Sequence, residues 1–388
     1  MNIPNTFSAS GDALHAAASA ATGLDDFGPS HDYQPGLTRL LDALDRDGPR
    51  LAPGGREFVF GTLVGVLVAR LTLQRSLRDL PEEAARTIVR PLVITGVPRT
   101  GTTALHKLLS VDPQFQGLER WLTAFPVPRP PRASWPSNPM YQATVAGIEA
   151  FLARAPEMRA AHDMVADDVD ECLEVLKQGF CSNTYGSTFR VPGYDAWWAG
   201  QDEGASYRRY ANALSVIGAG DARPWLLKNP GHIHTLDHLL AVFPDACIVQ
   251  THRDPVQALP SLCSVLAMAR RLSEGDNVVP AEIGAREIAN WEKAVTRAMA
   301  LREQAPPRQF LDVRHRDFHR DPMGVVRRIY RHFGYELSPQ VEKAMQARIH
   351  ANPEGRHGAH FYTSEHFGLE PGAIRERFAA YIERYNLA

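Results

Sequence analysis

The chain is poor in the features that mark secreted, metal-binding and nucleic-acid-binding proteins. Its 388 residues include four cysteines, whose spacing fits no metal site: Cys172, Cys181, Cys247 and Cys263. A disulfide framework in a chain of this length needs more cysteines, so we expect these to be reduced. The formal net charge is −2, which predicts neither nucleic acid nor an anionic membrane surface as a partner.

Long apolar runs are also scarce. The N-terminus has neither the charged start nor the apolar core of a signal peptide. The most apolar run, Phe58–Ala69, is too short to span a bilayer and stops at Arg70. We therefore expect a cytoplasmic protein without a membrane span, in which residues 58–69 form a buried helix.

A lysine is missing from the segment that otherwise looks most like a nucleotide-binding loop. Residues 91–113 read PLVITGVPRTGTTALHKLLSVDP, an apolar strand, a glycine-containing turn and the start of a helix. The unpaired N–H groups and the dipole of a helix start attract anions. The spacing from Gly96 to Gly101 is that of a Walker A loop, but Thr102 stands where an NTPase has lysine. The cation is Arg99 instead, which predicts phosphate binding without ATP hydrolysis.

A strand–turn–helix with two glycines is also common in proteins that bind no phosphate, so a second site is needed. Residues 246–266, ACIVQTHRDPVQALPSLCSVL, read as a buried strand followed by a helix that begins near Pro255. Arg253 and Ser261 are eight residues apart, and their guanidinium and hydroxyl groups suit a phosphate monoester. By itself, the pair Arg253 and Asp254 also fits a local ion pair ahead of a helix.

Together the two segments resemble the sulfotransferase superfamily that uses 3′-phosphoadenosine-5′-phosphosulfate (PAPS). GVPRTGTT is similar to its 5′-phosphosulfate loop, in the arginine-bearing form of the bacterial branch that is related to tyrosylprotein sulfotransferases. Arg253 and Ser261 resemble its 3′-phosphate pair, at the same eight-residue separation and 154 positions after Arg99. The stretches Trp225–His232 and Phe243–Pro255 are similar as well, and the likeness runs from about residue 91 to 384.

This resemblance implies sulfonate transfer from PAPS to a hydroxyl (or amine) of a small-molecule acceptor, giving PAP and requiring no metal. The C-terminal segment that contains Arg356 loosely resembles a loop that closes over the 3′-phosphate, but it reads equally well as a plain flexible loop. The implied cofactor-binding residues are Arg99, Thr100, Gly101, Thr102, Thr103, Arg253, Ser261 and Arg356.

The catalytic residues implied by the resemblance are Arg99, Lys228 and a general base. Lys228 ends an apolar strand, where a desolvated lysine calls for an anion, and a snorkelling surface lysine is the alternative. For the base, Glu119 follows the loop at the distance seen in the tyrosylprotein branch, although it also suits an ion pair with Arg120. His162 lies at the distance of the histidine in cytosolic members, and a nearby carboxylate would raise its basicity. The choice between Glu119 and His162 stays open.

The element pattern predicts an α/β fold, with a P-loop-type parallel sheet flanked by helices and a helical N-terminal region. Residues 1–90 read as helical, and residues 91–388 read as the PAPS-binding domain. Buried strands are expected at 92–94, 225–228, 247–251 and 309–313, alternating with helices as in doubly wound sheets. Ligands bind such sheets at the carboxyl ends of the strands.

Two other functions are compatible with a phosphate-binding loop: a P-loop nucleotide kinase or NTPase, and a non-catalytic nucleotide-binding protein. Against the first stand the missing lysine and the lack of a convincing Walker B strand. Aromatic residues such as Trp121, Tyr194 and Trp197 suit a pocket for an aromatic or apolar alcohol, although they suit a protein core at least as well.

Overall fold

The structure, a computed structural model, describes residues 3–47, 50–156, 164–351 and 363–388. The chain forms two compact units, each assembled from three stretches of sequence. The first unit comprises Met1–Thr87, Glu119–Ala222 and Leu266–Val278. The second comprises Ile88–Leu118, Arg223–Val265 and Val279–Ala388. The first unit is helical, and the second contains the β-sheet.

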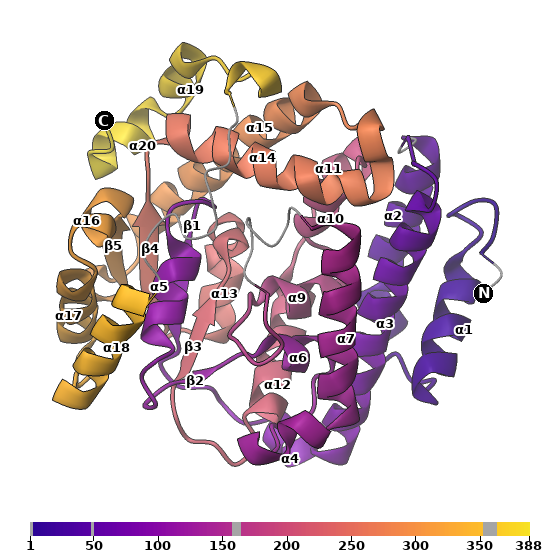
Figure 1. The fold of residues 1–388 in the computed structure, drawn as a ribbon, viewed down its shortest axis with the longest axis horizontal. Coiled ribbons are helices and arrows are strands. Elements are labelled where there is room, and N and C mark those ends of the chain that lie inside the picture. The colour runs from indigo at the N-terminus through magenta and orange to yellow at the C-terminus, as the bar shows by residue number, and fades with distance from the viewer. Residues whose placement is uncertain (1–2, 48–49, 157–163, 352–362) are drawn as a thin grey trace. The chain divides into compact units, whose positions relative to one another are not determined.

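The sheet has five strands, all parallel, in the order β2-β3-β1-β4-β5 (Figure 1). The predicted α/β fold is confirmed, and four strands lie within two residues of the expected bounds. The two-residue strand β2 was not predicted, because so short a strand leaves no apolar pattern. The strands are β1 (Leu92–Gly96), β2 (Gln116–Gly117), β3 (Trp225–Lys228), β4 (Cys247–His252) and β5 (Phe310–Arg314).

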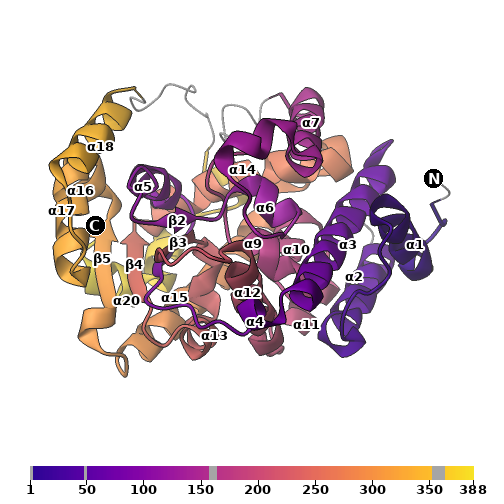
Figure 2. The ribbon, with the colours of Figure 1, turned by 90° about the horizontal axis from the view of Figure 1, so that it is seen from below.

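Helices cover both faces of this sheet (Figure 2). On one face, Leu92 and Ile94 share an apolar cluster with α5 (Thr102–Leu109) and α17 (Pro322–Phe333). The other face packs against α15 (Pro280–Arg302) and α20 (Ala379–Tyr385). Polar side chains of these two helices form hydrogen bonds with residues of β4 and β5. The alternation follows from the period-two geometry of a strand.

The other elements of the second unit connect these layers. Several begin with proline at the first helical turn, where its missing N–H costs no hydrogen bond. The full set of these connecting elements is η4 (Pro230–His234), α13 (Leu236–Val242), α14 (Pro255–Glu274), η6 (Pro307–Gln309), α16 (His315–Arg320), α18 (Pro339–Ala351), η7 (Glu365–Phe367) and α19 (Pro371–Arg377). The helix α14 continues into the first unit from Leu266.

The first unit packs helices around a core of its own. Its longest helix is α3, and helices from residues 120–217 complete it. The elements are α1 (Gly11–Thr22), η1 (Ser30–Asp32), α2 (Gln34–Arg46), α3 (Gly55–Asp79), α4 (Pro81–Ala84), α6 (Arg120–Ala124), η2 (Arg132–Ser137), α7 (Pro139–Arg154), α9 (Leu173–Leu176), η3 (Lys177–Gly179), α10 (Thr184–Thr188), α11 (Pro192–Trp198), α12 (Gly204–Ile217) and η5 (Gly275–Asn277).

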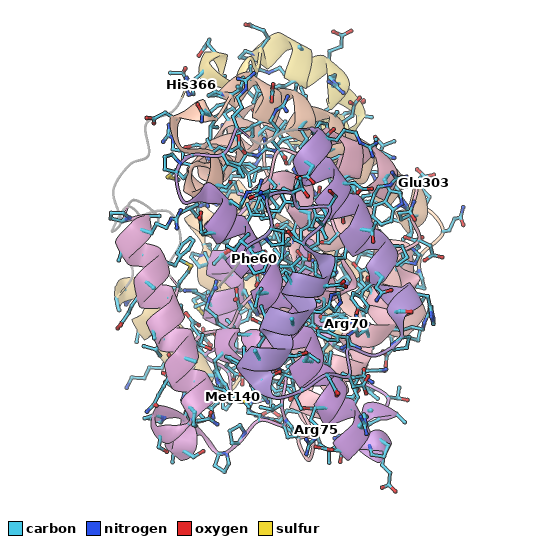
Figure 3. All side chains as sticks on the ribbon, turned by 90° about the vertical axis from the view of Figure 1, so that its right-hand side faces the viewer. Phe60, Arg70, Arg75, Met140, Glu303 and His366 are labelled. Carbon is cyan, nitrogen blue, oxygen red and sulfur yellow. The ribbon has the colours of Figure 1, made fainter. Side chains whose placement is uncertain are left out.

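The apolar run 58–69 lies within a buried helix, as predicted, and this helix, α3, extends beyond Arg70 to Asp79. Phe60 and Arg70 are both fully buried in this unit (Figure 3). The Arg70 guanidinium donates hydrogen bonds to the carbonyls of Phe27 and Gln178, at 2.7 and 3.1 Å. By length and composition α3 could cross a membrane, but 56% of its most apolar window is buried, as in a core helix.

Candidate active site

The turn between β1 and α5 holds its shape through three residues with positive φ. Gly96 has φ +140° and Gly101 has φ +92°. A Cβ on Gly96 would lie 2.4 Å from the carbonyl oxygen of Thr251, so only glycine fits there. Arg99, at φ +66°, is one of the few non-glycine residues with positive φ. Such strained conformations cluster at functional sites.

Hydroxyl groups tie this turn to the neighbouring strand β4. Thr100 Oγ1 donates to the carbonyl of Val97 at 2.7 Å and lies 2.5 Å from Thr251 Oγ1. Thr251 in turn donates to the carbonyl of Thr95 at 3.3 Å. All three threonines are buried. The loop that precedes α5 is therefore fixed by the end of β4, the strand that also leads to Arg253.

Arg99, Arg253 and Ser261 come together at the carboxyl edge of the sheet. Arg99 Nε donates to Ser261 Oγ at 3.1 Å. Arg253 Nη1 donates to the carbonyl of Arg99 at 3.1 Å, and its guanidinium also contacts Gln257 Oε1 at 3.3 Å. Two arginines and a serine from separate elements thus lie together at this edge. Such a donor set suits phosphate groups.

Lys228 lies at the end of β3, next to the first turn of α5. Its side chain is buried, and Nζ donates to Thr103 Oγ1 at 3.3 Å. His106, one turn further along α5, is also buried, and its Nε2 has no hydrogen-bond partner in the part of the chain that the structure describes. Burial, reinforced by the charge of Lys228, holds the pKa of His106 well below its usual value. Lys228 is therefore not a snorkelling surface lysine.

Glu119 belongs to the first unit and precedes α6. Its carboxylate accepts a hydrogen bond of 3.0 Å from Arg129 Nε, and Arg129 also pairs with Asp221 at 3.6 Å. Burial raises the pKa of Glu119, although the charge of Arg129 opposes this. The sequence suggested Arg120 as the alternative ion-pair partner; this was wrong, because Arg120 pairs with Asp170 instead.

Two residues singled out in the sequence, His162 and Arg356, lie outside the described residues. No group of three or more metal-ligating side chains occurs among the residues that the structure does describe.

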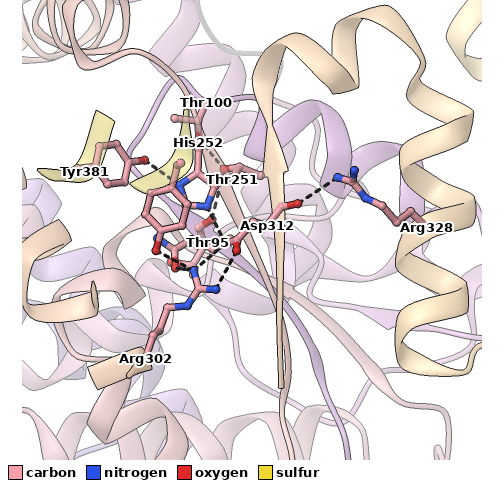
Figure 4. Close-up of polar contacts among 10 residues, drawn as sticks. Thr95, Thr100, Thr251, His252, Arg302, Asp312, Arg328 and Tyr381 are labelled. Carbon is pink, nitrogen blue, oxygen red and sulfur yellow. Dashed lines mark hydrogen bonds and ion pairs between the residues drawn. The ribbon is translucent and has the colours of Figure 1, made fainter. Parts of the chain in front are cut away.

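The structure also reveals a polar network around His252, the residue before Arg253, that the sequence did not suggest (Figure 4). His252 contacts the Tyr381 hydroxyl through Nδ1 at 3.0 Å and Asp312 Oδ1 through Nε2 at 2.9 Å. Arg302 donates to both oxygens of Asp312, at 2.6 and 3.0 Å. Burial alone would raise the pKa of Asp312. The hydrogen bonds from His252 and Arg302 outweigh this effect and hold the pKa of Asp312 well below its usual range. Strand register brings His252 and Asp312 onto neighbouring strands, β4 and β5, whereas Arg302 and Tyr381 reach them from α15 and α20 through packing that no sequence signal indicated.

In sequence, the chain is similar to known sulfotransferases. A profile of the sulfotransferase family matches residues 91–339. The omega-hydroxy-beta-dihydromenaquinone-9 sulfotransferases Stf3 of Mycobacterium bovis and Mycobacterium tuberculosis are each 24% identical to it over 254 residues. The match covers 63% of this chain and 62% of theirs, so the chain spans less than two thirds of the length of these relatives.

Two solved structures resemble the whole chain. Sulfotransferase STF1 from Mycobacterium tuberculosis is 38% identical, with a TM-score of 0.85 over 95% of this chain and 98% of that one. Sulfotransferase STF9 from Mycobacterium avium is 26% identical, with a TM-score of 0.86 over 100% and 99%. The profile match over residues 91–339 and the similarity to STF1 show that the protein belongs to the sulfotransferase family.

Proposed function

We propose that this sulfotransferase transfers the sulfonate of PAPS to a hydroxyl group of an apolar small-molecule acceptor and releases PAP. The convergence of Arg99, Arg253 and Ser261 supports this most strongly. A nucleotide with phosphate groups at both ends needs donors at two places. Here the loop after β1 and the end of β4 supply them side by side.

The residues at this edge fit such a nucleotide. Gly96 and Gly101 leave the backbone of the loop open to a close approach, and α5 begins with two threonines. When bound, PAPS supplies a sulfonate that is activated by its phosphate leaving group. We assign the 5′-phosphosulfate to residues 99–103. We assign the 3′-phosphate to Arg253 and Ser261, and we propose Arg356 as a further contact to it.

Lys228 would stabilise the negative charge that develops on the transferring sulfonate. Its burial and its contact with Thr103 support this role, because a cation held in a dry site acts more strongly than one in water. The base that takes the acceptor proton is Glu119 or His162. The raised pKa of Glu119 suits a base, since efficient proton transfer needs a pKa close to the working pH.

The name of Stf3 describes a sulfotransferase of an omega-hydroxy-dihydromenaquinone. We extend the class of that acceptor, an apolar alcohol, to this chain as a proposal. The closer relation to tyrosylprotein sulfotransferases and the cytoplasmic location stay predictions. Family membership favours this function over both alternatives, the nucleotide kinase or NTPase and the non-catalytic protein.

Sulfonate transfer from labelled PAPS to a panel of acceptors tests this proposal. The panel should contain a long-chain isoprenoid alcohol, a simple phenol and a sugar, each with a parallel magnesium–ATP assay. We expect label on the isoprenoid alcohol, with one PAP formed per sulfate transferred, and no ATP hydrolysis. PAP binding without transfer to any acceptor would contradict the proposed reaction, and magnesium-dependent ATP hydrolysis would favour the NTPase.

A further inference from the structure

Three neighbouring strands end in basic side chains at the same edge of the sheet. Arg99 follows β1, Arg253 follows β4 directly, and His315 follows β5 directly. His252 and Arg314 are paired in the register of β4 and β5, so Arg253 and His315 occupy equivalent positions one residue later. Adjacent strands lie about 4.8 Å apart. The backbone of His315 therefore lies beside that of Arg253.

The His315 ring also lies against the phosphate-binding loop. A Cβ on Gly101 would be 3.5 Å from His315 Cδ2, so the imidazole packs on the loop backbone just before α5 begins. Burial lowers the pKa of His315 to about 3, and the charges of Arg253, His319 and Arg99 contribute to this shift. His315 thus borders both arginines of the nucleotide site and is neutral at pH 7 while the site holds no anion.

His315 has a second histidine as its neighbour on α16. The Nε2 atoms of His315 and His319 are 2.7 Å apart, and the ring centroids are 3.9 Å apart. A hydrogen bond between two such nitrogens requires one ring to donate and the other to accept. With His315 as the donor through Nε2, its Nδ1 is the basic nitrogen of a ring that lies at the border of a cluster of guanidinium groups.

The charged groups around this pair are mostly cationic or already engaged. Arg314 Nε, on β5, donates to Asp317 Oδ2 at 2.8 Å, and Arg320 lies 3.8 Å from Oδ1 of the same carboxylate. After β4, Asp254 Oδ1 accepts from the backbone N–H of Val256 at 2.9 Å. A phosphate dianion beside Arg253 would therefore reverse the local potential at His315, from repelling a proton to attracting one.

We propose that His315, supported by His319, is a further contact to the phosphate group that Arg253 holds, and that it binds this phosphate with uptake of a proton. This inference rests on the proposed function, because the phosphate is the 3′-phosphate of PAPS or PAP. The proton comes from solvent and is taken up by Nδ1 of His315, while its Nε2–H keeps donating to Nε2 of His319. The resulting imidazolium donates a charge-assisted hydrogen bond to the phosphate.

Proton-coupled binding can be measured by titrating the full-length protein with PAP in a calorimeter. Two buffers of different ionisation enthalpy at pH 6.5 give the number of protons taken up. The variants are His315→Asn and His319→Asn, and His332→Asn is the matched control. His332 is an exposed histidine that contacts the carbonyl of Arg308, before the opposite end of β5. The phosphates of PAP bind protons themselves near pH 6, so the comparison rests on the difference in proton uptake between each site variant and the His332 control.

We expect PAP to bind wild-type protein and the His332 variant with the same proton uptake, and both site variants with less. The affinity of His315→Asn for PAP should be about tenfold lower at pH 6 and closer to wild type at pH 8.5, where the imidazolium is lost. His319→Asn should show the same trend. Agreement between the two variants would show that the effect does not come from a folding defect of one of them.

Equal proton uptake by wild type and both variants would overturn this inference while leaving PAP binding, and so the proposed function, intact. Failure of wild-type protein to bind PAP would refute both. A parallel titration with 5′-AMP distinguishes the two phosphates. Proton uptake that depends on His315 as strongly with 5′-AMP as with PAP would contradict the assignment to the 3′-phosphate.

Discussion

Lys228 Nζ donates a hydrogen bond of 3.3 Å to Thr103 Oγ1, so the buried cation at the end of β3 meets the first turn of α5. The same helix start follows the loop that carries Arg99. One edge of the sheet therefore brings together a buried ammonium group, a helix N-terminus and the guanidinium of Arg99. This arrangement suits the negative charge that develops in the proposed sulfonate transfer.

Replacement of Lys228 by methionine should lower turnover far more than nucleotide affinity. The side chain keeps its length but loses the charge, and removal of one preorganised donor costs about 10²–10³ in rate. Steady-state kinetics with PAPS and a PAP titration give the two quantities. Lys343→Met, at an exposed lysine of α18, is the control. A Lys228→Met enzyme with wild-type turnover would remove this lysine from the reaction.

Glu119→Gln should lower turnover by about 10²-fold or more while PAP binding stays near wild type, if Glu119 is the base. Because burial raises the pKa of Glu119, the acid limb of the wild-type pH–rate profile should lie above the ordinary carboxyl range, and activity should fall as the pH drops through it. Glu149→Gln, at an exposed glutamate of α7, serves as the control. Unchanged turnover would shift the assignment to His162.

Asp312→Asn should destabilise the protein at neutral pH by about 1–2 kcal/mol. This allows for the partial exposure of the carboxylate. The folded-state pKa of Asp312 lies below its unfolded value, so its contribution is present above about pH 4 and is lost as the pH falls further. Urea unfolding at pH 7 and pH 3 measures the difference.

The matched control for that measurement is Asp237→Asn. Asp237 is equally exposed and pairs with the exposed Arg297 at 2.7 Å, a type of ion pair that contributes under about 1 kcal/mol. A loss at Asp312 that is no larger than at Asp237, or that is unchanged at pH 3, would contradict the role given to the His252 network.

Gly96→Ala should impair both folding and PAP binding, because the new Cβ would collide with the carbonyl of Thr251 at φ +140°. We expect a loss of at least about 2 kcal/mol in the free energy of unfolding. Gly61→Ala is a good control, since its Cβ would meet nothing within 4 Å in α3 and alanine favours a helix by about 1 kcal/mol. A Gly96→Ala protein as stable as Gly61→Ala would argue against the tight loop.

Much of the sheet could be predicted because its strands are short apolar runs bounded by turn residues. Leu92–Gly96 and Cys247–His252 have this pattern, and each leads into a segment to which we assign phosphate binding. The resemblance to sulfotransferases assigned Arg99 and Ser261 to opposite ends of one nucleotide, and it did not predict a contact between them. The structure supplies the contact itself, a hydrogen bond across 162 positions of sequence.

The remaining features depend on contacts that no local pattern records. Arg70 looks like the polar end of an apolar run, but it is buried within α3, where its guanidinium donates to the carbonyls of Phe27 and Gln178. His315 looks like one basic residue among several. Only the pairing of β4 with β5 and the position of Gly101 place it beside Arg253.

The affinity of the protein for PAP, 5′-AMP and ATP, measured side by side by calorimetry without an acceptor, tests the central claim most directly. Two donor groups, one for each phosphate end, predict that PAP binds at least about tenfold more tightly than either 5′-AMP or ATP. The preference for PAP over 5′-AMP should disappear in Arg253→Ala. Equal affinities of the wild-type protein for all three nucleotides would contradict the account.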